Sequence, residues 1–463
     1  MTTSTFLKRI RLLERFRGLA GRALTIGITL STAACAAGAV VEPPATTASQ
    51  EDIYRTLYPY YAEICAASQL RKNPGFGAEI SSGVGGHAVL YLNRVCRKGD
   101  VAYPVLVMCD QTRDPADGVG LSVNASYKNA NWVATEGRNF FFNGDLPPGK
   151  PLTRDAYRAT LAKAKAKGIY KGVTFHDEVY DEMPPGFTRE DYKYERSVST
   201  DYALDFGRNR YCARVPLSRA EMVTIVKFLN DQNEPYQNGT AEFDWNLFTH
   251  NCAHMNHNAL AAAHIWNEWE TDRFILFALF SFPVPKNEFV NLMRRTNDLP
   301  IDDLDALYGD DAARRLLLQD GRLPTQPGAL ADLGTIPPLN DVYNTKSRII
   351  FLDEQITGPY LGYFDAILQQ PRYYRLQDNL AYFAGLYAKI TANRQPVETY
   401  LARHPGMSPE KQADFRRFYT AYFDYIGHQT KEVARTIARL DSLPPDGGVL
   451  IGDQTAPVPA KHG

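Results

Sequence analysis

A cysteine and a histidine that lie far apart in the chain are the residues best suited to covalent chemistry. Cys252 directly follows Asn251, and His87 follows the glycine-containing run 83–86 and opens the apolar run 88–92. A thiol at a helix start loses its proton more easily, because free backbone N–H groups and the positive end of the helix dipole stabilise the thiolate. A nearby imidazole can remove that proton. The two residues therefore predict a cysteine nucleophile with His87 as general base, provided that the fold brings them together.

The segment after Cys252 has the apolar spacing of a helix. Spacings of four and three place one stripe along it, made of Met255, Ala259, Ala262, Trp266 and Trp269. Cys252 lies three residues before this stripe, in the first turn, and Asn251 is a favoured N-cap residue. The amides of that turn could also donate to an oxyanion. The alternative interpretation is a small buried cysteine without reactivity.

His87 is expected at the head of a strand. In that strand Val89 and Tyr91 share its face, whereas Ala88 and Leu90 take the other. The preceding glycines would let a ligand or another backbone segment approach closely. A histidine held in the core by ordinary hydrogen bonds is the alternative.

These two motifs resemble the Lnb-type N-terminal periplasmic domain family of unknown function, which is similar to circularly permuted papain-like hydrolases such as NlpC-like peptidases and lecithin retinol acyltransferases. The motifs are Gly86-His87-Ala88 followed by a strand and, much later, Asn251-Cys252 on a helix. Segments 137–144 and 211–217 look like the aromatic-glycine segment and the strand-to-helix segment of the family, and the resemblance covers about residues 55–270. Ala253 stands where the family typically has Thr.

The resemblance implies an α+β, permuted papain-like domain in which an antiparallel sheet packs against helices. It also implies that Cys252 and His87 act as nucleophile and base, with the histidine strand preceding the cysteine helix. The residue that would orient His87 is left open between Asn124 and Asn131.

Three histidines around Cys252 suggest a rival chemistry. His250, His254 and His257 are spaced by four and three residues, and zinc favours Cys and neutral imidazole ligands. The run lacks a His-Glu-x-x-His signature, so these histidines are expected to face solvent along the helix. We therefore expect no metal and no other cofactor.

The N-terminus predicts export from a bacterial cytoplasm. A basic region precedes an apolar stretch from Ala23 to Ala37, which is short for a membrane span. The run Thr32-Ala33-Ala34-Cys35 resembles a lipoprotein cleavage box, which would make Cys35 the lipidated first residue and residues 36–50 a flexible tether. A plain signal peptide is the alternative. The expected location is the periplasmic cell envelope, with a lipid anchor in the membrane.

The other cysteines agree with an oxidising compartment. Cys65, Cys96, Cys109 and Cys212 allow three disulfide connectivities. A bridge from Cys96 to Cys109 across a hairpin is plausible, because a strand-like run lies between them; four buried thiols are the alternative.

Composition and patterning suggest two folded domains. The chain has 463 residues and a formal charge of -1, which offers no basic field for nucleic acid. We expect a signal segment at 1–35, the catalytic domain at 51–270, a helical domain at 271–443 and a disordered tail at 444–463. Within them, 51–70 and 155–167 are expected to be helical, and Ser218 with Glu221 forms a predicted capping box before another helix. Apolar stripes over 380–390 and 415–426 predict two C-terminal helices.

Two classes of function follow from these patterns. The first is an envelope hydrolase or acyltransferase that cleaves an amide or ester in a peptide, lipid or glycan, with a peptide amide preferred. The second is a non-catalytic binding or assembly lipoprotein on the same scaffold, or a metal-binding protein that uses the cluster from His250 to His257.

Overall fold

The computed structural model describes residues 48–77, 86–99, 101–109, 118–246, 250–266, 284–346 and 360–443. Within these residues, helices and antiparallel strands form an α+β structure, as predicted. No helix in this part of the chain is long and apolar enough to cross a membrane. The predicted signal segment with Cys35, residues 36–47 of the tether and the tail 444–463 lie outside the described residues.

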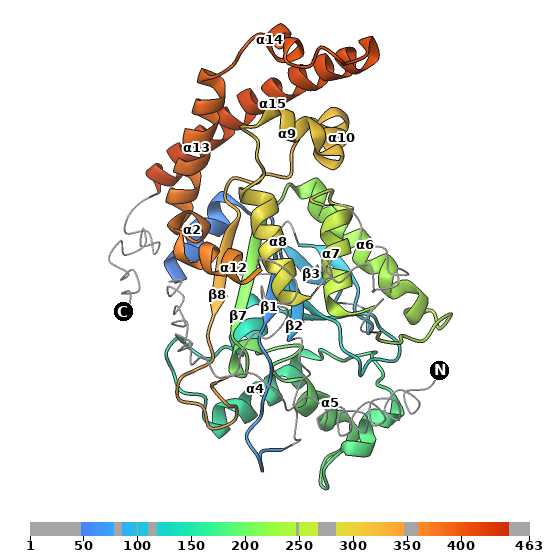
Figure 1. The fold of residues 1–463 in the computed structure, drawn as a ribbon. Helices are drawn as coiled ribbons and strands as arrows, with labels where there is room; N and C mark the ends of the chain where they lie inside the picture. Colours follow the sequence, from blue (N-terminus) through green and yellow to red (C-terminus); the bar gives the residue numbers. More distant parts are fainter. Residues whose placement is uncertain are drawn as a thin grey trace, which may run out of the picture. The chain divides into compact units, whose positions relative to one another are not determined.

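A six-stranded sheet in the order β6-β5-β2-β1-β7-β8 organises the structure (Figure 1). All neighbouring strands in it are antiparallel. The strands, in sheet order, are Val133–Glu136, Gly118–Ser122, His87–Asn93, Tyr61–Ala67, Arg210–Pro216 and Leu330–Gly334. A separate hairpin pairs β3 (Val95–Arg97) with β4 (Leu106–Met108).

The helix expected over residues 51–70 is only half correct. Helix α2 covers Ala48–Leu57, and the chain then becomes the strand β1. Residues 61–67 include good helix formers, but all seven are buried and paired with β7, and residues 62–67 are also paired with β2. Tertiary pairing therefore overrides local propensity in this segment.

The two faces of the sheet are covered by different elements. On one face, Ile64 and Leu90 share a core with α6 (Arg219–Gln237), α7 (Cys252–Ala262) and α8 (Pro285–Asn297). On the other face, the core includes residues of α2 and of α3 (Arg138–Asn143). The strands β2 and β1 are thus buried on both faces, which explains their nearly continuous apolar sequences.

Several predicted helices are confirmed with their caps. Helix α4 covers Arg154–Lys167, and α6 begins with the capping box in which Ser218 and Glu221 exchange both hydrogen bonds. Between α4 and α6 in the sequence, helix α5 covers Arg189–Ser197, and the short 3-10 helices η1 and η2 cover Asp177–Glu182 and Leu204–Phe206.

The chain after residue 271 contributes to two cores. Its helices α9, α10, α13, α14 and α15 build a separate aromatic core that contains the two predicted stripes. These helices cover Leu304–Gly309, Asp311–Asp320, Leu376–Ala392, Val397–Ala402 and Pro409–Ser442. The 3-10 helix η4 (Pro371–Tyr373) and helix α12 (Tyr360–Gln369) precede α13.

We expected the region 271–443 to be entirely helical, and this expectation is wrong. Strand β8 forms the edge of the sheet beside β7, and α8 packs on β1 and β7. The five residues of β8 have an acid at their centre, so their sequence alone gives little indication of a strand. The burial of that acid, Asp332, depends on arginines from other elements.

Two disulfides link the described cysteines. Cys96 and Cys109 join across the β3–β4 hairpin, as predicted, and Cys65 and Cys212 join the neighbouring strands β1 and β7. Among the described residues, this leaves Cys252 as the free thiol.

Candidate active site

Cys252 is the first residue of helix α7, in the position that the sequence predicts. The Asn251 side chain caps the helix and accepts from the N–H groups of Ala253 and His254, at 2.8 and 3.1 Å. These two amides are therefore occupied, which corrects the expectation that the first-turn amides as a group could hold an oxyanion. The N–H group of Cys252 itself is the first-turn amide that does not donate to the cap.

The sulfur of Cys252 lies at the beginning of β2. The N–H group of Ala88, one peptide bond beyond His87, donates to Sγ at 3.4 Å. Burial raises the pKa of the Cys252 thiol, while the N–H groups of Ala88 and Ala253 and the charge of Arg208 act in the opposite direction. The resting residue is thus a half-buried, protonated thiol, and the neighbouring N–H groups and Arg208 only partly offset the effect of burial.

His87 is the first residue of β2 and is only 6% exposed. Its Nε2 lies 3.0 Å from the hydroxyl oxygen of Ser122 on β5. Burial, together with the positive charge of Arg208, lowers the pKa of His87 to about 3, so its imidazole is neutral at pH 7. A neutral imidazole can act as a base.

The structure brings His87 and Cys252 to the same end of β2, but within the described residues no hydrogen bond joins their side chains. Strand alternation places the imidazole on the face of Val89, whereas Leu90 packs with α7. The thiol meets the peptide that follows His87 rather than its ring.

Ser122 and Asp201 form an orienting chain behind His87 that the sequence did not predict. The Ser122 hydroxyl lies 2.7 Å from Oδ1 of Asp201 and 3.1 Å from the carbonyl oxygen of Thr200. A hydroxyl has one proton, so we assign it as the donor to the carboxylate and the acceptor from the Nε2–H of His87. This tautomer leaves Nδ1 of His87 as the unprotonated ring nitrogen.

Asp201 is held by two further hydroxyl groups. Tyr127 and Tyr170 donate to its Oδ2 at 2.5 and 2.8 Å. Burial raises the pKa of Asp201, and these hydrogen bonds oppose that shift. The carboxylate is thus satisfied on both oxygens and fixes Ser122.

The two asparagines proposed to orient His87 have other contacts. Asn124 reaches this chain only at its far end, through a 3.4 Å hydrogen bond from Nδ2 to Asp201. The backbone N–H of Asn131 donates to Asn233 at 2.7 Å, and neither asparagine is hydrogen-bonded to His87. The polar residue that contacts the ring is Ser122, which is two positions before Asn124 on the preceding strand.

Arg208 supplies a buried positive charge at this site. It is 1% exposed and donates to the backbone carbonyl oxygens of Ser199 and Ser68. Ser68 follows Ala67, which pairs with His87, so the guanidinium lies at the same end of the sheet. Burial lowers the pKa of Arg208 to about 10, and interaction with Cys252 opposes that shift. No sequence motif marks this residue.

The prediction that the histidines after Cys252 face solvent is wrong for His254 and His257. His254 and His257 are 2% and 8% exposed, because α6, α8 and β2 surround α7. His257 Nδ1 pairs with Glu288 of α8 at 2.8 Å, and its ring stacks on Trp266. Among the described residues, the group whose potential ligand atoms converge within 4.8 Å is Glu63, Cys65 and Cys212, and both sulfurs there are in a disulfide.

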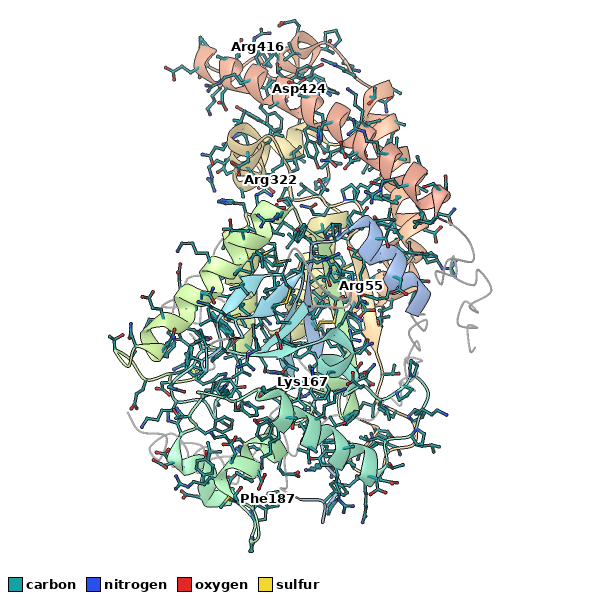
Figure 2. All side chains as sticks on the ribbon, turned by 180° about the vertical axis from the view of Figure 1, so that it is seen from behind. Arg55, Lys167, Phe187, Arg322, Arg416 and Asp424 are labelled. Carbon is teal, nitrogen blue, oxygen red and sulfur yellow. A yellow bond between two sulfur atoms is a disulfide. The ribbon has the colours of Figure 1, made fainter. Side chains whose placement is uncertain are left out.

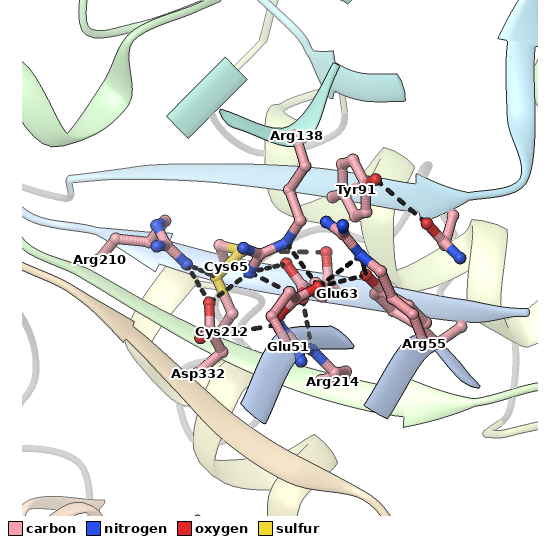
Figure 3. A network of polar contacts seen from close by, with 12 residues as sticks. Glu51, Arg55, Glu63, Cys65, Tyr91, Arg138, Arg210, Cys212, Arg214 and Asp332 are labelled. Carbon is pink, nitrogen blue, oxygen red and sulfur yellow. Dashed lines mark hydrogen bonds and ion pairs between the residues drawn. A yellow bond between two sulfur atoms is a disulfide. The ribbon is translucent and has the colours of Figure 1, made fainter. Parts of the chain in front are cut away.

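A second buried polar cluster, the charge network, occupies the face of the sheet opposite to α7, which is also the face of the His87 ring (Figure 3). Glu63 of β1 accepts from Arg138 at 3.0 Å and from Arg214 at 2.5 Å, and Asp332 of β8 accepts from Arg138 at 2.6 Å and from Arg210 at 2.7 Å. The charge network consists of Glu51, Arg55, Glu63, Arg138, Asp205, Arg210, Arg214 and Asp332. It contains four acids and four arginines, so its formal charge cancels.

No protein-family model, curated protein or solved structure matches this chain.

Proposed function

We propose that the protein is an exported cell-envelope cysteine hydrolase or acyltransferase in which Cys252 is the nucleophile and His87 the general base. The observation that carries the proposal is the position of the free thiol, at a capped helix start and within 3.4 Å of the peptide that follows His87. The buried guanidinium of Arg208 at the same end of the sheet favours the thiolate over the thiol.

The proposed reaction is acyl transfer. Nδ1 of His87 removes the Cys252 proton, and the thiolate attacks the carbonyl carbon of an amide or ester. The N–H group of Cys252, which does not donate to the Asn251 cap, is the donor to the developing oxyanion. His87 then returns the proton to the leaving amine or alcohol, and water or another acceptor releases the acyl group from the thioester.

This reaction requires Nδ1 and Sγ to approach within hydrogen-bond distance. Because strand alternation places the imidazole on the face of Val89, the ring of His87 has to turn at the start of β2 before Nδ1 can reach Sγ. Ser122 and Asp201 favour this approach, because they hold Nε2 and leave Nδ1 to accept the proton.

The substrate class follows from the proposed location. With a lipid anchor at Cys35 and a periplasmic body, the substrate is a cell-envelope peptide, lipid or glycan, and a peptide amide is the preferred bond. This assignment rests on the family resemblance and on the signal segment, which is an argument by analogy.

One observation favours a non-catalytic binding or assembly lipoprotein instead. Burial raises the pKa of the Cys252 thiol, whereas a nucleophilic cysteine usually has a lowered pKa. On this alternative, Asn251 and Cys252 only anchor α7 to the start of β2.

Thiol labelling across pH distinguishes the two functions. The full chain is treated with iodoacetamide from pH 5 to 10 without reductant, and the modified residue is identified by mass spectrometry. We expect labelling at Cys252, none at this position in Cys252→Ser, and roughly tenfold slower labelling near pH 7 in His87→Ala, because the proposed base that takes the thiol proton is lost. His404→Ala, which removes an exposed histidine, is the matched control and should behave as wild type.

Labelling that is the same in wild type and His87→Ala would contradict the dyad and favour the binding protein. A second measurement tests turnover. Incubation with cell-envelope peptide, phospholipid or glycan ester fractions, followed by intact mass analysis, should show an acyl adduct that is absent in Cys252→Ser.

A further inference from the structure

A cationic cavity, separate from Cys252, lies beside the β3–β4 hairpin. Its volume is about 460 Å³, and its walls come from this hairpin, from the end of β6 and from the C-terminal end of α4, where Figure 2 labels Lys167. The hairpin that forms one wall is closed by the Cys96–Cys109 disulfide. One wall is therefore a hydrogen-bonded hairpin that is also closed by a covalent bond.

The charge of the lining is strongly one-sided. Among the described residues that line the cavity, Arg97, Lys98, Lys167 and Lys171 supply four positive charges and Glu136 one negative charge, so their formal charge is +3. Oε1 of Glu136 accepts from the backbone N–H of Arg97 at 3.1 Å, which turns the carboxylate toward the hairpin backbone. In contrast to the charge network, these four cations form no ion pair with an acid among the described residues.

The cations also retain unused donors. Arg97 is half-buried and donates through Nη1 to the carbonyl oxygen of Gly168 at 3.0 Å, which leaves Nε and Nη2 without a partner among the described residues. Within the same part of the chain, the ammonium groups of Lys98 and Lys171 make no hydrogen bond or ion pair. Lys167 donates to the carbonyl oxygen of Glu136 at 3.2 Å and keeps two further donors.

We propose that this cavity binds a phosphate group, either on a small soluble compound or on the headgroup of a lipid. A guanidinium with two free donors matches the geometry of phosphate oxygens, and the flanking ammonium groups act as point charges on a dianion. A single carboxylate carries one charge and would leave the cavity strongly positive. The site is independent of the reaction proposed for Cys252.

Calorimetric titration of the full chain tests the proposal. The probes are inorganic pyrophosphate and dihexanoyl phosphatidic acid, with dihexanoyl phosphatidylcholine as the lipid without a free phosphomonoester. We expect saturable one-to-one binding of at least one of the first two probes. In Lys98→Ala/Lys171→Ala binding should weaken about tenfold or more, because two charge-assisted contacts are lost.

The matched control is Lys150→Ala/Lys346→Ala, which removes the same charge from two exposed lysines outside the cavity. It should bind within about twofold of wild type if the effect is local, since exposed charges beyond a Debye length are screened. Preference for pyrophosphate indicates a soluble ligand, and preference for phosphatidic acid indicates a lipid.

Absence of saturable binding of both probes at millimolar concentration would overturn the proposal, as would equal weakening in the two double variants. Labelling of Cys252 is unaffected in either case, so failure of this site is distinguishable from failure of the proposed hydrolase.

Discussion

The two buried charged regions of the sheet differ in how their charges are balanced. In the charge network each acid faces at least one arginine, and the four acids cancel the four arginines (Figure 3). At the beginning of β2, Arg208 donates to two carbonyl oxygens, and within the described residues no carboxylate forms an ion pair with it. Charges that cancel one another hold the fold together but leave little net electrostatic potential. The positive potential around Arg208, in contrast, can stabilise a nearby anion.

The pKa shifts of Glu51 in the charge network and of His87 beside Arg208 also reflect how the charges around them are balanced. Although burial opposes it, interaction with Arg138 and Arg214 lowers the pKa of Glu51 in the charge network to about 2. Among the described residues no carboxylate contacts the His87 ring directly, and burial followed by Arg208 lowers its pKa to about 3. Glu51 therefore stays ionised over the range in which a histidine would normally gain a proton, and His87 stays neutral, whereas burial raises the pKa of Asp205 in the same network.

The largest expected effect comes from breaking the charge network. Glu63→Gln leaves Arg138 and Arg214 without one of their carboxylates, and the free energy of unfolding should fall by about 3–5 kcal/mol, as for other buried pairs that lose one partner. Urea unfolding followed by circular dichroism measures this change.

Asp155→Asn, in an exposed pair with Arg158, is the control for that measurement and should change stability by less than about 1 kcal/mol. A loss of less than that from Glu63→Gln would mean that the network is dispensable for stability.

The pH dependence of stability should separate the two regions. The pKa of His87 is about 3 when folded and about 6.5 when unfolded, so between these values the unfolded chain binds the additional proton, and stability falls as pH falls. From pH 7.5 to pH 5 this residue should cost about 2 kcal/mol. The loss from Glu51 begins only below about pH 4.5, its unfolded value.

Unfolding of wild type and His87→Gln at both pH values gives the contribution of His87 as a difference. The comparison between proteins is needed because burial also lowers the pKa of His254, to about 4, and raises the pKa of Asp201. Equal pH dependence in the two proteins would show that His87 is not neutral and buried in the native state.

Removing the unbalanced charge should affect chemistry. In Arg208→Met the labelling rate of Cys252 near pH 7 should fall about tenfold, because the thiolate loses a neighbouring cation that lowers the pKa of the thiol. Arg208→Lys should retain most of the rate. The pH profile of iodoacetamide labelling is the measurement, with exposed Arg158→Met as control. An unchanged profile in folded Arg208→Met would assign the arginine to structure alone.

The smallest expected effect is that of the orienting chain. Ser122→Ala removes the acceptor at Nε2 of His87, so both tautomers of the ring become populated and labelling of Cys252 should slow only about threefold, within the range for one hydrogen bond. Long-range proton–nitrogen NMR reports the tautomer directly. A single Nε2–H form that persists in Ser122→Ala would show that Ser122 does not position the ring.

Features that depend on neighbours in sequence were predictable from the chain alone. The Asn251 cap, the capping box before α6, helix α4, the hairpin disulfide and the apolar stripes of α13 and α15 all follow from local hydrogen bonding or from a helical period. Cys252 and His87 stood out because their types and flanking residues carry chemical meaning, and their assignment as a dyad stays a prediction.

Tertiary structure decided the features in which a polar residue is satisfied by distant partners. Strand β1 replaced a predicted helix because strands from two other parts of the chain pair with it. His257 is buried because Glu288 lies opposite, and Ser122, Asp201 and Arg208 converge on the start of β2 from three separate segments. Burying a polar group costs free energy unless a partner is present, and the identity of that partner is set by the fold rather than by the residues beside it in the sequence.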